Sequence, residues 1–181
     1  MNQSQTLDEL LVIRCKEGDG KAFALLVKRW QPKILRHAYR MTGESAVAKD
    51  VAQETWIAAI KGISNLRDPA VFKVWIYRIA SNKCVSWIRS RQKHRRMAEY
   101  VRQNPEDKTP IEEDDKMTRL RLELQDLPDN QKVVLTLFYL ENQSMHEISQ
   151  SLGVPVGTVK SRLYHAREQL KKRYYEKYEK T

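Results

Sequence analysis

The apolar residues of this chain recur at steps of three and four, which is the spacing of one face of an α-helix. The pattern is present over residues 23–34, 47–59, 72–88, 117–127 and 133–138. No stretch of useful length alternates apolar and polar positions as a half-buried strand would. The sequence therefore predicts an all-α fold.

Helix-breaking and helix-starting residues set the expected ends of these elements. Pro32 is expected to bend the first helix or restart it, because proline removes a backbone donor. Gly43 is expected to end the next piece, and Ser45 to cap the helix that follows. Residues 62–69, GISNLRDP, combine glycine, proline and short polar side chains, so we predict a loop there.

Charge is distributed unevenly along the chain, whose net charge is +10. Residues 1–103 hold 20 Lys/Arg against 9 Asp/Glu, residues 104–117 hold 2 against 6, and residues 118–181 hold 11 against 8. The acidic segment also contains prolines and has no apolar period, so we predict an acidic flexible linker over 98–117. It would join two small helical domains, an N-terminal bundle over 1–97 and a C-terminal domain over 118–181.

The C-terminal domain carries the pattern of a helix-turn-helix. Ser144 and Glu147 are spaced as a capping box that starts a short helix, and Gly153 suits the turn that ends it. A second helix is expected to begin near Gly157, with apolar residues on its inner face. In this motif the second helix enters the major groove of DNA. The side chains suited to phosphates and base edges there are Thr158, Lys160, Ser161, Arg162 and Tyr164.

A plain helical bundle with a solvated basic helix is the alternative interpretation of this pattern. Two helices joined by a glycine turn occur in such bundles as well. Lys171, Lys172 and Arg173 are assigned to this interpretation, as ordinary charges facing the C-terminal end of the helix dipole.

The N-terminal domain carries a second face suited to nucleic acid. Arg78, Asn82, Ser86 and Arg89 lie at steps of four, four and three, and Trp75 and Tyr77 precede them. A basic run without acids follows, formed by Lys83, Arg89, Arg91, Lys93, Arg95 and Arg96. Charges that track a backbone and aromatics that stack on bases are typical of single-strand binding. The alternatives are that Trp75 belongs to the core and that the basic run is a solvated helix end.

Other function classes find little support in the sequence. The four histidines are far apart without metal-ligand spacing, and no phosphate loop, nucleophile elbow or defensible carboxylate pair is present. We therefore expect no catalytic residue, no metal and no cofactor. No apolar run is long enough to span a bilayer and the N-terminus is unlike a signal peptide, so no membrane insertion is expected. Cys15 and Cys84 lie in apolar helical patterns, which favours buried thiols and a cytoplasmic location.

Three blocks of the chain together resemble the extracytoplasmic-function class, also called group IV, of bacterial RNA polymerase sigma factors. They are KDVAQETWIAAIKGI (49–63), VFKVWIYRIASNKCVSWIRSRQKHRR (71–96) and the segment 127–170 that contains the helix-turn-helix. The resemblance covers nearly the whole chain. It implies a promoter-specific transcription initiation factor with sigma domain 2 in the N-terminal part and sigma domain 4 in the C-terminal part.

The resemblance also implies roles for individual residues. Asp50, Gln53 and Glu54 would bind the clamp coiled coil of core polymerase, although they would otherwise read as surface residues balancing nearby lysines. The loop residues Ser64, Asn65 and Arg67, together with Leu66, would hold a flipped base of the minus-ten element. Contacts with the same DNA strand are implied for Trp75, Arg78, Asn82, Lys83, Ser86 and Arg89.

For the minus-thirty-five element, the resemblance implies contacts by the second helix of the helix-turn-helix. The matching positions are Thr158, Lys160, Ser161, Arg162, Tyr164, His165 and Arg167. His165 departs from the family pattern, in which a basic residue is common at this position, and a neutral imidazole attracts phosphate less. The base preference at His165 is therefore left open.

Further partners are implied by the same resemblance. Domain 4 would contact the polymerase flap, and an anti-sigma factor is a possible regulator. The linker would lie in the basic channels of the polymerase and mimic RNA charge through Glu106, Asp107, Glu112, Glu113, Asp114 and Asp115. The rival interpretation is a stand-alone helix-turn-helix regulator that binds an operator as a dimer, but neither a dimer interface nor a sensor domain is evident.

Overall fold

The computed structural model describes residues 3–99 and 123–178, with the backbone alone for 93–99 and 178. Every regular element within these ranges is helical, which confirms the all-α prediction. The N-terminal half contains the helices α1 (Gln3–Lys16), α2 (Gly20–Thr42), α3 (Ser45–Gly62) and α4 (Phe72–Glu99), with the short 3₁₀ turns η1 (Ile63–Asn65) and η2 (Pro69–Val71). The C-terminal half contains α6 (Asp129–Leu135), η3 (Thr136–Leu140), α7 (Met145–Leu152) and α8 (Val156–Tyr178).

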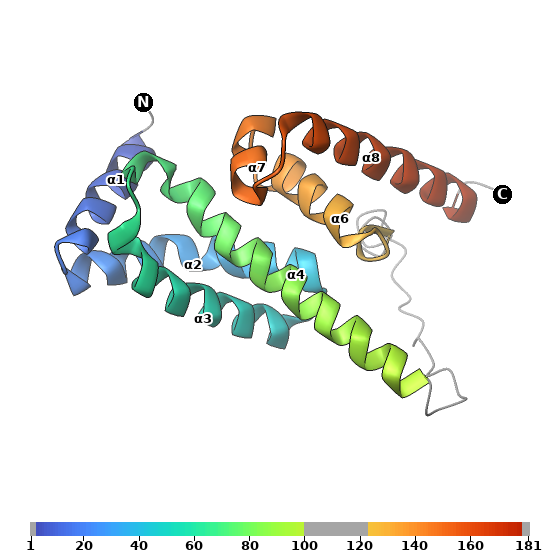
Figure 1. Cartoon of the computed structure of the whole chain (residues 1–181), viewed down its shortest axis with the longest axis horizontal. Coiled ribbons are helices and arrows are strands. Elements are labelled where there is room, and N and C mark those ends of the chain that lie inside the picture. Colours follow the sequence, from blue (N-terminus) through green and yellow to red (C-terminus); the bar gives the residue numbers. More distant parts are fainter. Residues whose placement is uncertain (1–2, 100–122, 179–181) are drawn as a thin grey trace.

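The long helix α4 lies between the other helices of the N-terminal half and the C-terminal half (Figure 1). Helices α1, α2 and α3 pack on one side of it, whereas α6 and α7 contact it on the other and α8 packs on them. The apolar core of the bundle continues into the C-terminal half through Val133, Val134, Leu137, Ile148, Val159 and Leu163. The two halves are therefore packed against each other in this structure.

Buried side chains follow the apolar periods of the sequence. On α4 the predicted inward residues are all buried, from Phe72 through Ile76, Ala80 and Cys84 to Ile88. The stripe on α3 is buried in the same way, at Val47, Val51, Thr55 and Ala59. Because each stripe removes one helix face from water, the hydrophobic effect holds the helices in these orientations.

The expected cap of α3 is wrong, and of the two outcomes expected at Pro32, a bend or a restart, the restart does not occur. Helix α2 runs through Pro32. Pro32 is exposed, so water can reach the carbonyl that loses its partner, while the buried Trp30 and Ile34 hold the helix to the core. Ser45 is the first residue of α3 and not its cap; Glu44 precedes the helix without a capping bond, and its carboxylate pairs with Arg91 instead.

Several predicted helix ends are confirmed. Gly43 and Gly153 end α2 and α7 with φ of 77° and 64°, the left-handed region in which a Cβ is strained. The chain also turns at Asn142, which has φ of 49°. The helix expected over 117–127 is described only from residue 123, where helical structure continues to 125, before Pro128. The predicted linker lies outside the described residues from position 100 onward.

Candidate nucleic-acid interface

The outward face of α4 carries the polar residues that the sequence placed on one side of this helix. Arg78, Asn82, Ser86 and Arg89 are all exposed, directly opposite the buried apolar stripe of the same helix. The structure therefore brings their side chains to one solvent-facing surface, where a charged strand could run along the helix.

The loop before α4 presents polar side chains from an anchored backbone. Leu66 is 7% exposed and belongs to the core, and its carbonyl accepts a hydrogen bond of 2.9 Å from Lys16 Nζ. Its neighbours Ser64, Asn65 and Arg67 are exposed. Leu66 thus fixes the loop while the three polar residues face solvent.

The two aromatic residues at the start of α4 have different surroundings. Trp75 is half-buried, with its ring 5.9 Å from that of Phe72, and a Cβ on Gly62 would lie only 3.1 Å from its ring. Tyr77 is 2% exposed and its hydroxyl donates to Glu141 at 2.6 Å. Burial and the neighbouring Glu141 raise the pKa of Tyr77. The expectation that Tyr77 belongs to a base-stacking face is therefore wrong.

Acidic residues compensate part of the basic run in three dimensions, although none lies within the run itself. Lys83 Nζ is 2.9 Å from Glu54 Oε2 on α3, and Arg91 pairs with Glu44. The guanidinium of Arg91 also lies over the ring of Trp87 at 5.2 Å. Lys93, Arg95 and Arg96 lie where the side chains are not described. The interpretation of an uncompensated run is thus wrong for these two described positions.

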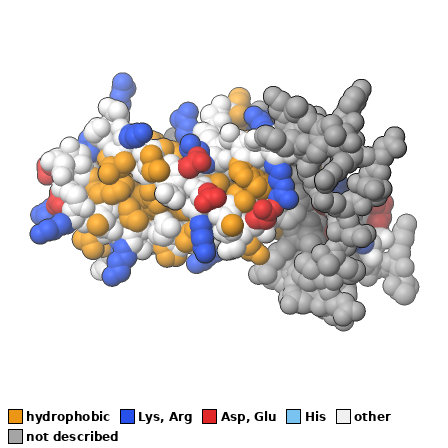
Figure 2. All heavy atoms as spheres, turned by 90° about the horizontal axis from the view of Figure 1, so that it is seen from below, with side chains coloured by type: hydrophobic (Ala, Val, Ile, Leu, Met, Phe, Trp, Pro, Cys, Tyr) orange, Lys and Arg blue, Asp and Glu red, His pale blue; other side chains and the backbone are white. Residues whose placement is uncertain are grey.

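A mixed acidic and apolar patch covers the outer face of α3. Asp50, Gln53 and Glu54 are exposed, and Ile57 and Ile60 beside them are 48% and 58% exposed. Figure 2 shows the molecule from the side of α3, where apolar side chains gather with acids between them and Lys and Arg mostly at the edges. Neither isoleucine was among the predicted site residues; their position outside the buried stripe of α3 is the signal that identifies them. Exposed apolar side chains gathered on one face are typical of a protein interface.

The C-terminal half contains the predicted helix-turn-helix. The capping box of α7 is present: Ser144 Oγ accepts from the Glu147 amide at 3.2 Å, and Glu147 Oε2 accepts from the Ser144 amide at 2.7 Å. Burial favours a higher pKa for Glu147, but the Ser144 hydrogen bonds and the charge of Lys73 outweigh it and lower that pKa. Helix α7 is therefore held by a charged carboxylate at its start.

The second helix, α8, has a buried apolar face and an exposed polar face. Val159, Leu163 and Ala166 are buried against α6 and α7, which fixes the orientation of the helix. The opposite face presents the predicted DNA-contacting residues: Lys160, Ser161, Tyr164, His165 and Arg167 are exposed, and Thr158 and Arg162 are half-buried. The Tyr164 and His165 rings lie edge to face at 5.5 Å. Helix α8 thus has an apolar face held by the domain and a polar face open to solvent.

The structure offers little that points to catalysis. Among the residues it describes, no group of three or more His, Cys, Asp or Glu side chains could hold a metal ion. Cys15 and Cys84 are buried and not disulfide-bonded, and burial raises the pKa of Cys84 to about 12, which keeps it a thiol. No helix within the described ranges is long and apolar enough to cross a membrane.

Comparison with known families matches both halves of the chain. Residues 26–94 match the family model of sigma-70 region 2, and residues 117–170 match that of sigma-70 region 4. The region 2 match contains the polar face of α4 and the α3 patch, and the region 4 match contains the helix-turn-helix. We use the names region 2 and region 4 for the two halves from here on.

Similar proteins extend over almost the full length. The RNA polymerase sigma-H factor of Pseudomonas aeruginosa is 34% identical over 182 residues, covering 93% of this chain and 94% of that protein. The ECF RNA polymerase sigma-E factor of Haemophilus influenzae is 31% identical, covering 92% and 94%. These identities, over most of each chain, establish the family.

Two solved structures share the fold. CnrH, in complex with the cytosolic domain of CnrY, has a TM-score of 0.73 at 24% identity and covers 94% of this chain and 99% of that one. The sigma factor RpoE of Bartonella quintana, in complex with the anti-sigma factor NepR, has a TM-score of 0.68 at 21% identity and covers 84% and 96%. Taken together, the exposed helix-turn-helix, the polar α4 face and the full-length matches show that this chain belongs to the extracytoplasmic-function sigma factors, the non-catalytic subunits that bind core RNA polymerase and direct promoter-specific initiation.

Proposed function

We propose that this sigma factor reads its promoter through two separate faces and binds core polymerase through a third. The observation that supports this most directly is the exposure of three chemically different surfaces on one chain: a basic face on α4, a basic and hydroxyl-bearing face on α8, and an acidic and apolar patch on α3.

The face on α8 is proposed to contact the minus-thirty-five element as duplex. Its exposed side chains lie on the N-terminal part of the helix, the part that enters the major groove in this motif. Lys160 and Ser161 would contact base edges, and Arg162 would contact a phosphate. Tyr164 and His165 present rings to the same side, and Thr158 and Arg167 border them.

The face on α4 and the preceding loop are proposed to contact the minus-ten element as a melted strand. Arg78, Asn82, Ser86 and Arg89 would follow the backbone, and the loop residues Ser64, Asn65 and Arg67 would receive an unstacked base. One edge of the half-buried Trp75 could complete the surface. Lys83 would join the strand contacts only after leaving Glu54, to which it is paired at 2.9 Å.

The patch on α3 is proposed to bind the clamp coiled coil of core polymerase. Asp50, Gln53 and Glu54 offer acceptors to basic partner residues, and Ile57 and Ile60 add apolar area beside them. Charge complementarity sets the orientation of such contacts, while the apolar side chains contribute to affinity.

The experiment that tests these assignments is run-off transcription with purified core polymerase on genomic promoter fragments. Lys160→Ala is expected to reduce transcription from promoters that need the minus-thirty-five element, at a cost of about 1–3 kcal/mol in discrimination if the lysine reads a base. Lys171→Ala is the matched control, since Lys171 is an exposed lysine farther along α8 and outside the proposed face. Equal losses in both variants would reject the assignment.

Polymerase binding is tested separately by a pull-down with core enzyme. Asp50→Lys reverses a charge within the α3 patch and is expected to weaken the complex at least tenfold. Glu17→Lys is the matched control, because Glu17 is an exposed acid outside α3. Retention of full core binding by the Asp50 variant would exclude the α3 patch as the clamp-binding surface.

The proposal also includes two further partners, the bounds of the domains and the cellular location. The shared fold with the NepR complex supports an anti-sigma factor as a regulatory partner, and region 4 is proposed to contact the polymerase flap. We assign sigma domain 2 to residues 1–97, the linker to 98–117 and sigma domain 4 to 118–181. A cytoplasmic location follows from the partner, because RNA polymerase and its promoters are cytoplasmic in bacteria.

A further inference from the structure

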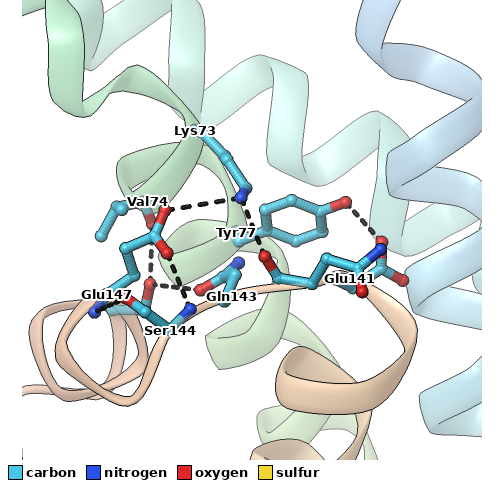
Figure 3. A network of polar contacts seen from close by, with 9 residues as sticks. Lys73, Val74, Tyr77, Glu141, Gln143, Ser144 and Glu147 are labelled. Carbon is cyan, nitrogen blue, oxygen red and sulfur yellow. Dashed lines mark hydrogen bonds and ion pairs between the residues drawn. The ribbon is translucent and has the colours of Figure 1, made fainter.

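Region 4 is docked onto region 2 through a polar network centred on Glu141, at the end of η3 (Figure 3). The side chain of Glu141 is 7% exposed although it lies in a turn. Its carboxylate is 2.7 Å from Arg40 Nη1 on α2 and accepts at 2.6 Å from the Tyr77 hydroxyl on α4. Hydrogen bonds that involve a charged group are the strong ones, so Glu141 is the principal polar contact between the regions.

A second set of contacts lies at the start of α7. Lys73 Nζ is 3.4 Å from both the Asn142 carbonyl and the Glu147 carboxylate. Ser151 Oγ donates to the Val74 carbonyl at 3.2 Å. Each of these bonds joins a residue of α4 to region 4, so the network spans the contact and is not confined to one turn.

The docked arrangement is incompatible with reading both promoter elements at once. Helix α7 contacts both α4 and α8. With packed helix axes 8–10 Å apart, the axes of α4 and α8 are separated by at most about 20 Å where they pack on α7. The minus-ten and minus-thirty-five elements are about 25 base pairs apart, or about 85 Å of duplex at about 3.4 Å per base pair. Region 4 must therefore leave region 2 before both proposed faces meet their DNA.

The contact has features of an interface that can open. Two of its buried polar atoms, His37 Nδ1 and Gln143 Nε2, have no hydrogen-bond partner among the described residues. A cavity of about 450 Å³ remains at the edge of the contact, lined by residues of both regions, among them Trp30, Lys33 and Asn142. Unpaired buried groups and imperfect packing both lower the free energy gained by docking, because water would satisfy those groups after separation.

We propose that Glu141 is a latch: its contacts with Arg40 and Tyr77 hold region 4 against region 2 in the unbound sigma factor, which we call the closed form. These contacts break when the sigma factor binds core polymerase. The closed form lowers the fraction of molecules whose two regions are separated, which is the open form. The apparent affinity for core polymerase is reduced in proportion to that fraction. Breaking the latch therefore raises both the open population and the apparent affinity. The spacing argument depends on the proposed promoter faces, whereas the latch itself depends only on the contacts between the regions.

Energy transfer between dyes on the two regions of the full-length chain measures the latch without polymerase. Cysteines introduced at Lys28 on α2 and Gln169 on α8, both exposed, can be labelled selectively because Cys15 and Cys84 are buried. Glu141→Gln removes the charge on the region 4 side of the contact. Tyr77→Phe removes a hydrogen-bond donor to that charge on the region 2 side. Each is expected to lower the closed-to-open ratio about tenfold, the effect of a hydrogen bond to a charged group.

The affinity of the same variants for core polymerase is the second measurement. If the open form is rare, the energy transfer changes little but the dissociation constant falls about tenfold, so one of the two readouts responds in either case. Glu176→Gln is the control: Glu176 is an exposed acid on α8 that pairs with Lys172 at 3.9 Å, and its loss should change neither readout. Low transfer in the unmodified chain overturns the proposal, as does a lack of response of both readouts to both latch variants. A failure of core binding by every variant, with a normal transfer response, would instead count against the α3 assignment.

Discussion

Between pH 7 and pH 5, the free energy of unfolding should fall by about 2 kcal/mol less in the His37→Gln variant than in the unmodified chain. The His37 ring is fully buried, with Nε2 3.0 Å from Ser81 Oγ and its centre 5.2 Å from the Tyr77 ring. Burial, with the positive charge of Arg40, lowers the pKa of His37 to about 3. The Glu141 carboxylate lies 3.9 Å from Nδ1 and favours the charged form, but burial outweighs it and the imidazole is neutral.

The sign and size of the stability change that His37 causes between pH 7 and pH 5 follow from proton linkage. In the unfolded chain a histidine has a pKa of about 6.5, so between pH 6.5 and about 3 the unfolded state binds a proton that the folded state does not. Stability is therefore lost as pH falls through this window and is fully present above it. One pH unit is worth about 1.4 kcal/mol, which gives a loss of about 2 kcal/mol at pH 5 relative to pH 7.

Urea unfolding of the unmodified chain and of His37→Gln, each at pH 7 and pH 5, measures this loss. Glutamine does not titrate and its amide can still bond the Ser81 hydroxyl, so the variant removes the proton-linked part alone. The other ionisable groups are common to both proteins and cancel in the comparison. Losses that agree within about 0.5 kcal/mol between the two proteins would refute the reasoning, because a buried neutral histidine must contribute in this range.

Three further predictions test the helix-turn-helix and the linker. Ser144→Ala should lower the free energy of unfolding by about 1 kcal/mol in thermal melts through loss of the α7 cap, whereas Ser45→Ala, without a capping role in α3, should change it by less than about 0.5 kcal/mol. Leu163→Ala should cost about 2–5 kcal/mol in urea unfolding, since Leu163 is 4% exposed; a smaller loss would mean that α8 is not held by its apolar face. Replacing the six acids of 104–117 with serine should alter the yield of abortive transcripts with promoter binding nearly intact; an unchanged yield would reject the RNA-mimic role.

Local patterns in the sequence are enough to predict which side of each helix faces the core and which side faces solvent. The apolar periods of α4 and α8, the capping box at Ser144 and the left-handed glycines at 43 and 153 depend on residues within a few positions of one another. Such local rules hold whatever the helices pack against. The exposed faces of α4 and α8 could be predicted for the same reason, because they are the complement of the buried stripes.

The contacts that these faces make with other helices depend on how the whole chain is assembled. Three features depend on residues from helices that are distant in sequence: the pairing of Lys83 with Glu54, the burial of Tyr77 and the latch at Glu141. Packing also overrode a local rule at Pro32, where the buried face of α2 keeps the helix continuous. The physical reason is the same in each case: the free energy of a charge or a proline depends on which groups and how much water surround it, and that is known only once the helices are assembled.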